Sequence, residues 1–404
     1  MIKKLSSLRV KLMISVIFII HFLAYFLIKD RGLMIDENLH YSQIVGFIRQ
    51  NYALSPGLAM LPGYHFVIAA IAQVVNASSV PAIRAISLLL NLISIPVFYM
   101  IARIIDYKSA IIKTVQYSFF PILFPFFALI YTDFFSLTLI LIAVYFIFRK
   151  KYHPAGIILS LDVLVRQNNL IWLVFLNIYI YLKTYGLVLR GRYLNDHMKN
   201  TMTFILGPII FDIFLMVYHR VSVGEQTLVY ATAVVPNNLF IMLFMSLIIF
   251  LPVNISLIKK FIVYWRKKIF LLAPLVILFF PFNHYFRVEN PYNLNTFFLH
   301  NLLFVYFTSG IYQKLIFFVF LILSIMFVRI IKLHRKEDYL LYLFTVIFFI
   351  PLWFIDIRYY MIPLTLFMLF RKSQGQSVEI ITTAYFILIS LVGYYGMYTW
   401  KFFI

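Results

Sequence analysis

The chain has 404 residues, of which 63% are hydrophobic and only 12% are charged, and it contains no cysteine. Soluble domains carry about 25% charged residues, so this composition excludes a soluble globular protein and indicates a polytopic membrane protein. The lack of cysteine excludes disulfides and thiolate metal sites. The net charge of +21 is spread in short basic clusters between apolar runs, which is typical of charges that orient membrane spans, so we expect no nucleic-acid partner.

Apolar runs of about 17–25 residues recur along the chain, and each is long enough to cross a bilayer as a helix. They lack the alternation of polar and apolar residues that barrel strands require, so the expected fold class is all-α, a polytopic transmembrane helical bundle. The first run, residues 12–28, follows several basic residues and precedes no small-residue cleavage site, which predicts a retained first helix. We find no internal repeat and expect one integral-membrane domain over residues 1–404.

Basic clusters predict the orientation of the spans, because such clusters collect on the cytosolic side. Placing all of them there gives about 12–13 crossings. The run 64–75 is too short to cross and is expected at the outer surface, whereas 80–104 crosses inward, 111–130 returns outward and 134–148 crosses inward again. Residues 29–79 then form the first exoplasmic loop, whose amphipathic stretches, such as 39–48, suit helices on the membrane face. The clusters are 3–11, 103–113, 149–151, 183–199, 259–268, 329–336 and 371–372.

The exoplasmic side of this topology collects carboxylates and arginines in a chain that is poor in acids. Asp36 and Glu37 directly follow the first span, and Asp133 and Arg166 lie at outer turns, as does Arg358. A carboxylate can accept the proton of an acceptor hydroxyl, and an arginine can stabilise a departing phosphate. The pattern therefore suggests glycosyl transfer from a lipid phosphate, with Asp36 and Glu37 as the catalytic acids.

Simpler structural explanations exist for the same residues. The acidic pair could cap a helix that starts near Asn38, and Asp133 could cap one that starts at Phe134. Arg166 lies four positions after Asp162 on one predicted helix, so the two charges could neutralise each other in the membrane. The outer tyrosines could stack on sugar rings or belong to an interfacial belt. The outer histidines fit no recognised zinc spacing, and we predict no metal-binding residue.

Five short islands occur in one order along the chain: IDENLH (35–40), LPGY (61–64), YTD (131–133), RQNNLIW (166–172) and RYYMIP (358–363). Together they resemble the dolichyl-phosphoglucose-dependent α-1,2-glucosyltransferase family of the GT-C superfamily. Eukaryotic members of that family add the last glucose to the lipid-linked oligosaccharide used in protein glycosylation. The resemblance implies a GT-C-like bundle and a polyprenyl- or dolichyl-phosphate glucose donor. It also implies a glycan or lipid-linked oligosaccharide acceptor.

The resemblance also implies roles for individual residues. Asp36 or Glu37 would act as the general base; the islands align best at Asp36, which leaves Glu37 to orient the acceptor or cap the helix. No cofactor is implied, and the need for a divalent metal is left open. The active site would face the lumen of the endoplasmic reticulum, or the exterior of the plasma membrane in a prokaryote. The residues expected to bind the donor phosphate or substrate are Tyr131, Asp133, Arg166, Gln167, Asn169, His300, Arg358 and Tyr359.

The chain departs from the family pattern in two loops. Residues 224–229 read GEQTLV, which keeps an acid but lacks the base and histidine of the family, and residues 290–292 and 299–302 read NPY and LHNL. These differences bear on the acceptor and the sugar more than on the reaction type, so a GT-C transferase for another sugar, such as mannose or arabinose, stays an alternative. A transporter or flippase for a lipid-linked sugar is a separate alternative.

Overall fold

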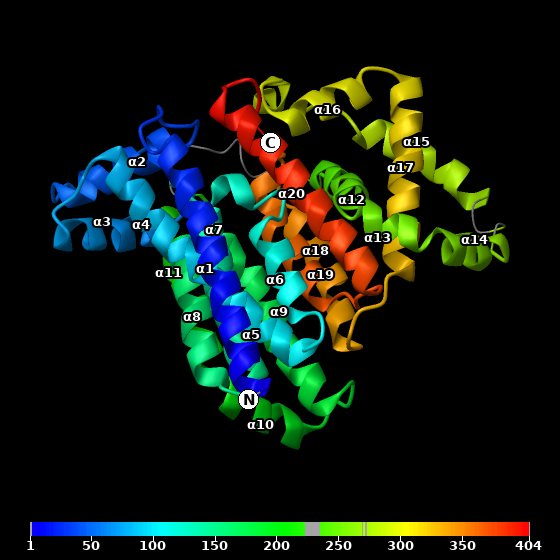
Figure 1. Ribbon diagram of the computed structural model, residues 1–404, viewed down its shortest axis with the longest axis horizontal. Helices are drawn as coiled ribbons and strands as arrows, with labels where there is room; N and C mark the ends of the chain where they lie inside the picture. The colour runs from blue at the N-terminus through cyan, green and yellow to red at the C-terminus, as the bar shows by residue number, and fades with distance from the viewer. Residues whose placement is uncertain (1, 223–234, 269, 271–272, 404) are drawn as a thin grey trace. The chain divides into compact units, whose positions relative to one another are not determined.

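The computed structural model describes residues 2–222, 235–268, 270 and 273–403 (Figure 1). Apart from two isolated bridges, every element of regular structure in these residues is a helix, which confirms the predicted all-α class. The described helices group into two compact units. Unit 1 comprises the residues up to 118 and from 123 to 222, and unit 2 comprises 119–122 and 235–403. A single domain over residues 1–404, with 29–79 as its first exoplasmic loop, stays a prediction.

Unit 1 is built around α7 (Thr132–Phe148), which is apolar over its whole circumference and buried on most of its residues. Such a helix needs cover on every side. It packs along α8 (Tyr152–Val165) and against α5 (Ser94–Ile105), while α2 (Glu37–Ile48) packs on α3 (Gly63–Val74). The other helices of unit 1 are α1 (Ile2–Ile28), α4 (Val80–Leu92), α6 (Ala110–Ser118), η1 (Phe124–Phe126), η2 (Gln167–Asn169), α9 (Leu170–Tyr185), α10 (Gly191–Asn200), η3 (Met202–Ile205) and α11 (Leu206–Tyr218).

Unit 2 is organised by α12 (Asn237–Ile249), which packs along α17 (Ile311–Ile330), and by α20 (Gln376–Tyr398), which packs against α13 (Leu251–Ser256). The short segment 119–122 belongs to this unit, and the Ser390 hydroxyl donates to the Phe119 carbonyl at 2.7 Å. The other helices of unit 2 are α14 (Ile258–Arg266), α15 (Ala273–Tyr285), η5 (Pro291–Leu294), α16 (Leu299–Thr308), η6 (Glu337–Tyr339), α18 (Leu340–Phe349), η7 (Ile357–Tyr360) and α19 (Met361–Phe370).

Four helical segments of the described chain are long and apolar enough to cross a membrane, which fits the predicted multi-pass protein: Leu8–Ile28, Val80–Ile105, Ile311–Ile330 and Gln376–Tyr398. A fifth would be the pair α10 and 202–218, bent by 77°, and six further apolar helices are shorter. The 12–13 crossings predicted from the apolar runs are therefore not confirmed. The predicted span 80–104 agrees with its helix, and α3 is as short as expected.

The predicted span 111–130 is wrong. Helix α6 ends at Ser118, and only the 3-10 turn η1 follows before α7 begins at Thr132. Pro121 and Pro125 lie in this stretch. Proline has no backbone N–H and its ring clashes with the carbonyl four residues earlier, which favours the end of the helix in this stretch.

Candidate functional site

The two adjacent acids at the start of α2 lie in different environments. Glu37 is fully buried, and its carboxylate accepts four hydrogen bonds. Oε1 accepts from Arg84 Nε at 3.1 Å and from the Ile130 N–H at 2.9 Å. Oε2 accepts from Arg84 Nη2 at 2.5 Å and from the Met34 N–H at 2.8 Å. Both oxygens of Glu37 are therefore engaged in a buried ion pair and in two backbone contacts.

Asp36, in contrast, is only half-buried. It occupies the N-cap position of α2 but makes no side-chain hydrogen bond to the end of the helix, so its carboxylate does not cap α2. Neighbouring residues on a helix project about 100° apart, which is why one acid turns into the protein while the other stays accessible. Of the two acids, Asp36 is the one that a substrate can approach.

Arg84 is a residue of this site that the sequence did not single out. Its guanidinium lies at the start of the span Val80–Ile105, is fully buried, and donates to the carbonyl oxygens of Ile28 at 2.7 Å, Arg31 at 2.8 Å and Gly32 at 3.0 Å. One side chain thus gathers the loop that leads from α1 to Asp36. A charged residue within an apolar span is itself a signal of function, and that signal could have identified Arg84.

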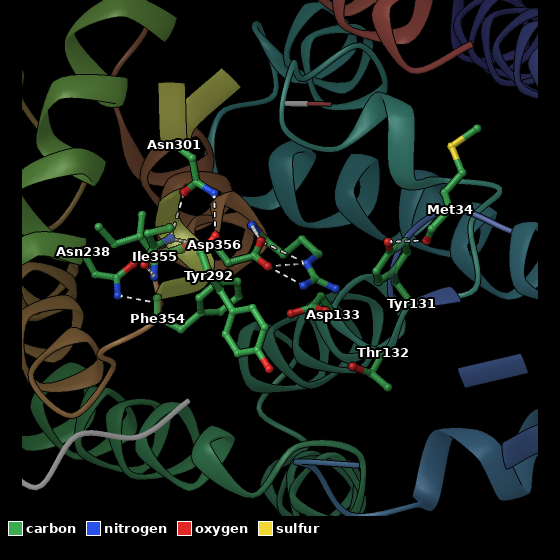
Figure 2. Close-up of polar contacts among 12 residues, drawn as sticks. Met34, Tyr131, Thr132, Asp133, Asn238, Tyr292, Asn301, Phe354, Ile355 and Asp356 are labelled. Atoms are coloured by element: carbon green, nitrogen blue, oxygen red, sulfur yellow. Dashed lines mark hydrogen bonds and ion pairs between the residues drawn. The ribbon is translucent and has the colours of Figure 1, made fainter. Parts of the chain in front are cut away.

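Tyr131 and a pair of histidines pack beside this loop. The Tyr131 hydroxyl donates to the Met34 carbonyl at 2.9 Å (Figure 2). His40 Nδ1 lies 2.9 Å from His65 Nε2, and the His40 ring meets the Tyr131 ring edge to face, with centroids 5.8 Å apart. Only 1% of Tyr131 is exposed, so its ring offers no open face for stacking on a sugar. The geometry gives Tyr131 a structural contact with the loop that carries Asp36.

Asp133 and Arg166 form a buried ion pair between α7 and the end of α8. Helix α7 begins at Thr132 and its N-cap is Tyr131, so the predicted cap by Asp133 of a helix starting at Phe134 is wrong. Arg166 Nη1 also lies 3.3 Å from the Thr132 hydroxyl oxygen. The extended backbone of Arg166, which ends α8, directs its side chain toward a carboxylate 33 positions earlier in the chain.

Two of the three amides that follow Arg166 hold the same turn in place. Gln167 Nε2 donates to the carbonyl oxygens of Ala59 and Val221, each at 2.8 Å, and its Oε1 accepts from the Leu61 N–H at 3.3 Å. Asn169 Nδ2 donates to the Ser136 hydroxyl at 2.6 Å. Both were predicted to bind substrate, and both make contacts that hold η2 against the rest of unit 1.

The predicted site residues of unit 2 lie around the start of η7. The guanidinium of Arg358 pairs with Asp356, and Arg358 Nε lies 3.0 and 2.9 Å from the two carboxylate oxygens. Asp356 Oδ1 also accepts the Arg358 backbone N–H at 2.9 Å, which caps η7. Burial raises the pKa of the Asp356 carboxyl, but the charge and hydrogen bonds of Arg358 and the charge of His300 outweigh it, so the pKa lies below its ordinary value.

A set of asparagines fixes His300 relative to Asp356. Asn293 Nδ2 donates to the Ile355 carbonyl at 2.9 Å and its Oδ1 accepts from the Ile355 N–H at 3.2 Å, while Asn293 also donates to Asn301 at 2.8 Å. Figure 2 shows Asn301 and Ile355 of this network, with Asp356 next to them in the same close-up. Asn301 directly follows His300 on α16, and Tyr359, which is mostly buried, follows Arg358. The network therefore ties the loop before α16 to the backbone just before Asp356.

An apolar cavity of about 300 Å³ opens between α12, α17, α18 and α19 in unit 2. Its walls include Leu239 and Leu243 of α12, Thr345 of α18, and Pro363 and Phe367 of α19. At the N-terminal ends of α12 and α19, the Tyr360 hydroxyl donates to Asn238 at 3.2 Å. This polar contact thus joins the ends of two helices that line the cavity.

Each unit brings together part of the predicted site. Unit 1 holds Asp36, Glu37, Tyr131, Asp133, Arg166, Gln167 and Asn169, and unit 2 holds His300, Arg358 and Tyr359. Within unit 1, Glu37 and Tyr131 both contact Met34, and Asp133 pairs with Arg166. The predicted departure at 224–229 lies outside the described residues. Among the residues that are described, no three His, Asp or Glu side chains are arranged to hold a metal ion.

Comparisons with known proteins bear on unit 1. The model of the DIE2/ALG10 family matches residues 31–192. The chain is 30% identical over 170 residues to the Drosophila melanogaster protein named Dol-P-Glc:Glc(2)Man(9)GlcNAc(2)-PP-Dol alpha-1,2-glucosyltransferase. That match spans 40% of this chain and 38% of the relative. No solved structure matches the chain. The matched residues include Asp36, Arg84, Asp133 and Arg166, and over residues 31–192 the resemblance to the DIE2/ALG10 family is thereby confirmed.

Proposed function

We propose that this protein is a membrane glucosyltransferase that moves glucose from a dolichyl- or polyprenyl-phosphate donor to a hydroxyl group of a glycan acceptor. The observation that carries the proposal is the similarity of residues 31–192 to the DIE2/ALG10 family, because this segment contains the accessible Asp36 and the Asp133–Arg166 pair. The relative's name supports glucose as the sugar and a lipid-linked oligosaccharide as the acceptor. A GT-C-like active site on the luminal or exoplasmic face belongs to the same proposal.

Asp36 acts as the general base in the proposed reaction. The acceptor hydroxyl oxygen forms a bond to the anomeric carbon of glucose while the bond from that carbon to the donor phosphate breaks, and Asp36 takes the hydroxyl proton. The lipid phosphate leaves with the electron pair, and an attack from the opposite side inverts the anomeric carbon. Glu37 is unsuited to the base role because its oxygens already accept four hydrogen bonds. A positioned base contributes about 10²–10⁴ in rate.

Each unit contains an arginine, held by a carboxylate, that could supply the positive charge that a departing phosphate requires. Arg166 is buried beside Asp133, and Arg358 is held by Asp356. A guanidinium has five N–H donors in a fixed plane and can serve a carboxylate and a phosphate together. The donor has an anionic head and a long apolar tail. Polar residues at the N-terminal ends of α12 and α19, followed along these helices by the apolar cavity, suit such a molecule.

An in vitro transfer assay with the purified chain tests this function. A panel of polyprenyl-phosphate sugars is offered with a lipid-linked oligosaccharide acceptor, and the product linkage is determined. We expect transfer from the glucosyl donor to form an α-1,2 linkage. Transfer only from a mannosyl or arabinosyl donor would refute the choice of sugar. Movement of a labelled lipid-linked sugar across vesicles without any chemical change would favour a flippase.

Narrowing the apolar cavity of unit 2 is expected to weaken donor binding. The variant Leu243→Phe fills space beside Thr345 and Phe367. Each buried CH₂ contributes about 0.8 kcal/mol, so excluding two such groups of the tail raises KM for a long-chain donor by about tenfold and leaves kcat unchanged. Leu388→Phe on the exposed face of α20 is the control. An equal rise in KM for a donor with a very short tail would contradict a tail-binding cavity.

A further inference from the structure

The residue directly before Asp36 has an unusual backbone. Ile35 has a φ of 52°, in the left-handed region. This region is rare for residues other than glycine and is unfavourable above all for β-branched side chains, whose Cβ crowds the neighbouring carbonyl. Such a conformation persists only where the surrounding structure imposes it, and it is concentrated at functional sites. The contacts on either side of Ile35 therefore have to be strong enough to hold it.

The contacts of Met34 and Glu37 impose this conformation. The Met34 N–H donates to Glu37 Oε2 at 2.8 Å, and the Met34 carbonyl accepts from the Tyr131 hydroxyl and the Glu37 N–H, each at 2.9 Å. Both backbone polar groups of the residue before Ile35 are thus fixed. The residue after Asp36 is fixed as well, because the Glu37 carboxylate is held by Arg84 and by the Ile130 N–H. Ile35 and Asp36 lie between two anchored residues.

Arg84 anchors the remainder of the loop. Its contacts with the carbonyl oxygens of Ile28, Arg31 and Gly32 fix the chain from the end of α1 onward. Ile130 and Tyr131 directly precede α7, which begins at Thr132 and carries Asp133. The same network therefore couples the loop with Asp36 to the start of α7, where Asp133 meets Arg166.

We propose that Arg84, Glu37 and Tyr131 are positioning residues that hold Ile35 in the left-handed conformation and thereby direct the Asp36 carboxylate toward the acceptor hydroxyl. The proposal rests on the proposed function, in which Asp36 is the base. A base works only within about 2.6–3.2 Å of the proton it takes, and a displacement of about 1 Å can cost 10²-fold in rate. A rotation at Ile35 swings the adjacent side chain by more than this.

The variant Tyr131→Phe tests the proposal with the loss of one hydroxyl group. We expect kcat to fall at least about tenfold, since the Met34 carbonyl loses an anchor and Ile35 relaxes, while KM for the donor stays unchanged. Adding Ile35→Gly should restore most of kcat, because glycine adopts positive φ without a steric penalty. Adding Ile35→Ala shortens the side chain almost as much but keeps the penalty, so it should restore nothing.

Two outcomes of this series would overturn the proposal. One is an unchanged kcat in Tyr131→Phe, and the other is equal rescue by glycine and alanine at position 35. A rise in KM for the donor without a change in kcat would likewise contradict a positioning role. A wild-type protein that transfers no sugar, or an active Asp36→Asn variant, would instead refute the proposed function itself.

A second measurement is independent of any activity. The chain has no cysteine, so Asp36→Cys introduces a single thiol whose rate of reaction with a maleimide reports the placement of residue 36. In this background, Tyr131→Phe should change the labelling rate at least about threefold, and Ile35→Gly, but not Ile35→Ala, should bring the rate back. Identical labelling rates in all four proteins would overturn the proposal even if glucosyl transfer is never detected.

Discussion

Asp36→Asn is expected to reduce kcat for glucosyl transfer by a factor of about 10²–10⁴, the contribution of a positioned general base. The substitution keeps the size and shape of the side chain and removes only its ability to accept a proton. Because Asp36 is half-buried and does not cap α2, the midpoint of thermal unfolding should stay that of the parent. Initial rates at saturating donor, together with an unfolding curve of each purified protein, provide the measurement.

Asp30 offers a matched control in the same loop. It is exposed, and its ion pair with Lys29 at 2.6 Å is at the surface, so Asp30→Asn makes the same chemical change outside the proposed site. We expect Asp30→Asn to retain full kcat. If Asp36→Asn also retained full kcat, Asp36 would not be the base. A loss of activity matched by a loss of folded protein would equally contradict a purely chemical role.

The hydropathy of the chain was sufficient to predict helical class and several helix limits. The predicted crossings 80–104 and 134–148 agree closely with Val80–Ile105 and with α7, because long apolar runs have few alternatives to a helix in a membrane, although the first of them contains Pro96 and is divided at Ile93 into α4 and α5. The prediction failed at 111–130, where two prolines interrupt the run. Hydropathy measures burial, whereas helix continuity depends on backbone hydrogen bonds that proline removes.

The site was less predictable than the fold. The adjacency of Asp36 and Glu37 draws attention to the loop before α2, but no local pattern says that Glu37 turns inward to an arginine 47 positions later. Likewise, Asp162 was the nearest acid to Arg166 in the sequence, whereas the ion pair with Asp133 joins two helices. Contacts of this kind arise from helix packing over long sequence separations, and one sequence without tertiary information does not contain them.

Arg371 shows the same limit for a cluster that was interpreted as topogenic. Arg371 and Lys372 were both expected to face the cytosol as orienting charges. Arg371 is fully buried, and its Nη1 and Nη2 each lie 2.7 Å from an oxygen of the buried Glu379. Glu379 Oε1 also accepts the Gln374 N–H at 3.1 Å. Only Lys372 is exposed, so adjacency in a basic pair does not establish a shared role.

Arg371→Met is therefore expected to destabilise the protein by about 3–5 kcal/mol, because it leaves the Glu379 carboxylate buried without its cation. The measurement is denaturant unfolding of the purified protein in detergent. The double variant Arg371→Met with Glu379→Leu should recover most of this loss, since a buried ion pair replaced by apolar side chains of similar volume is often neutral. The comparison separates the cost of an unpaired buried charge from the loss of packing.

Lys372→Met is the matched control, with the same substitution one residue further along. Its exposed ammonium should change the free energy of unfolding by no more than about 0.5 kcal/mol. A reporter of membrane orientation fused at the end of the chain adds a second comparison. If Lys372 alone orients this part of the chain, Lys372→Met shifts the orientation and the Arg371/Glu379 double variant does not. Equal instability of Arg371→Met and Lys372→Met would contradict the distinction, because burial of the charge is what sets the two residues apart.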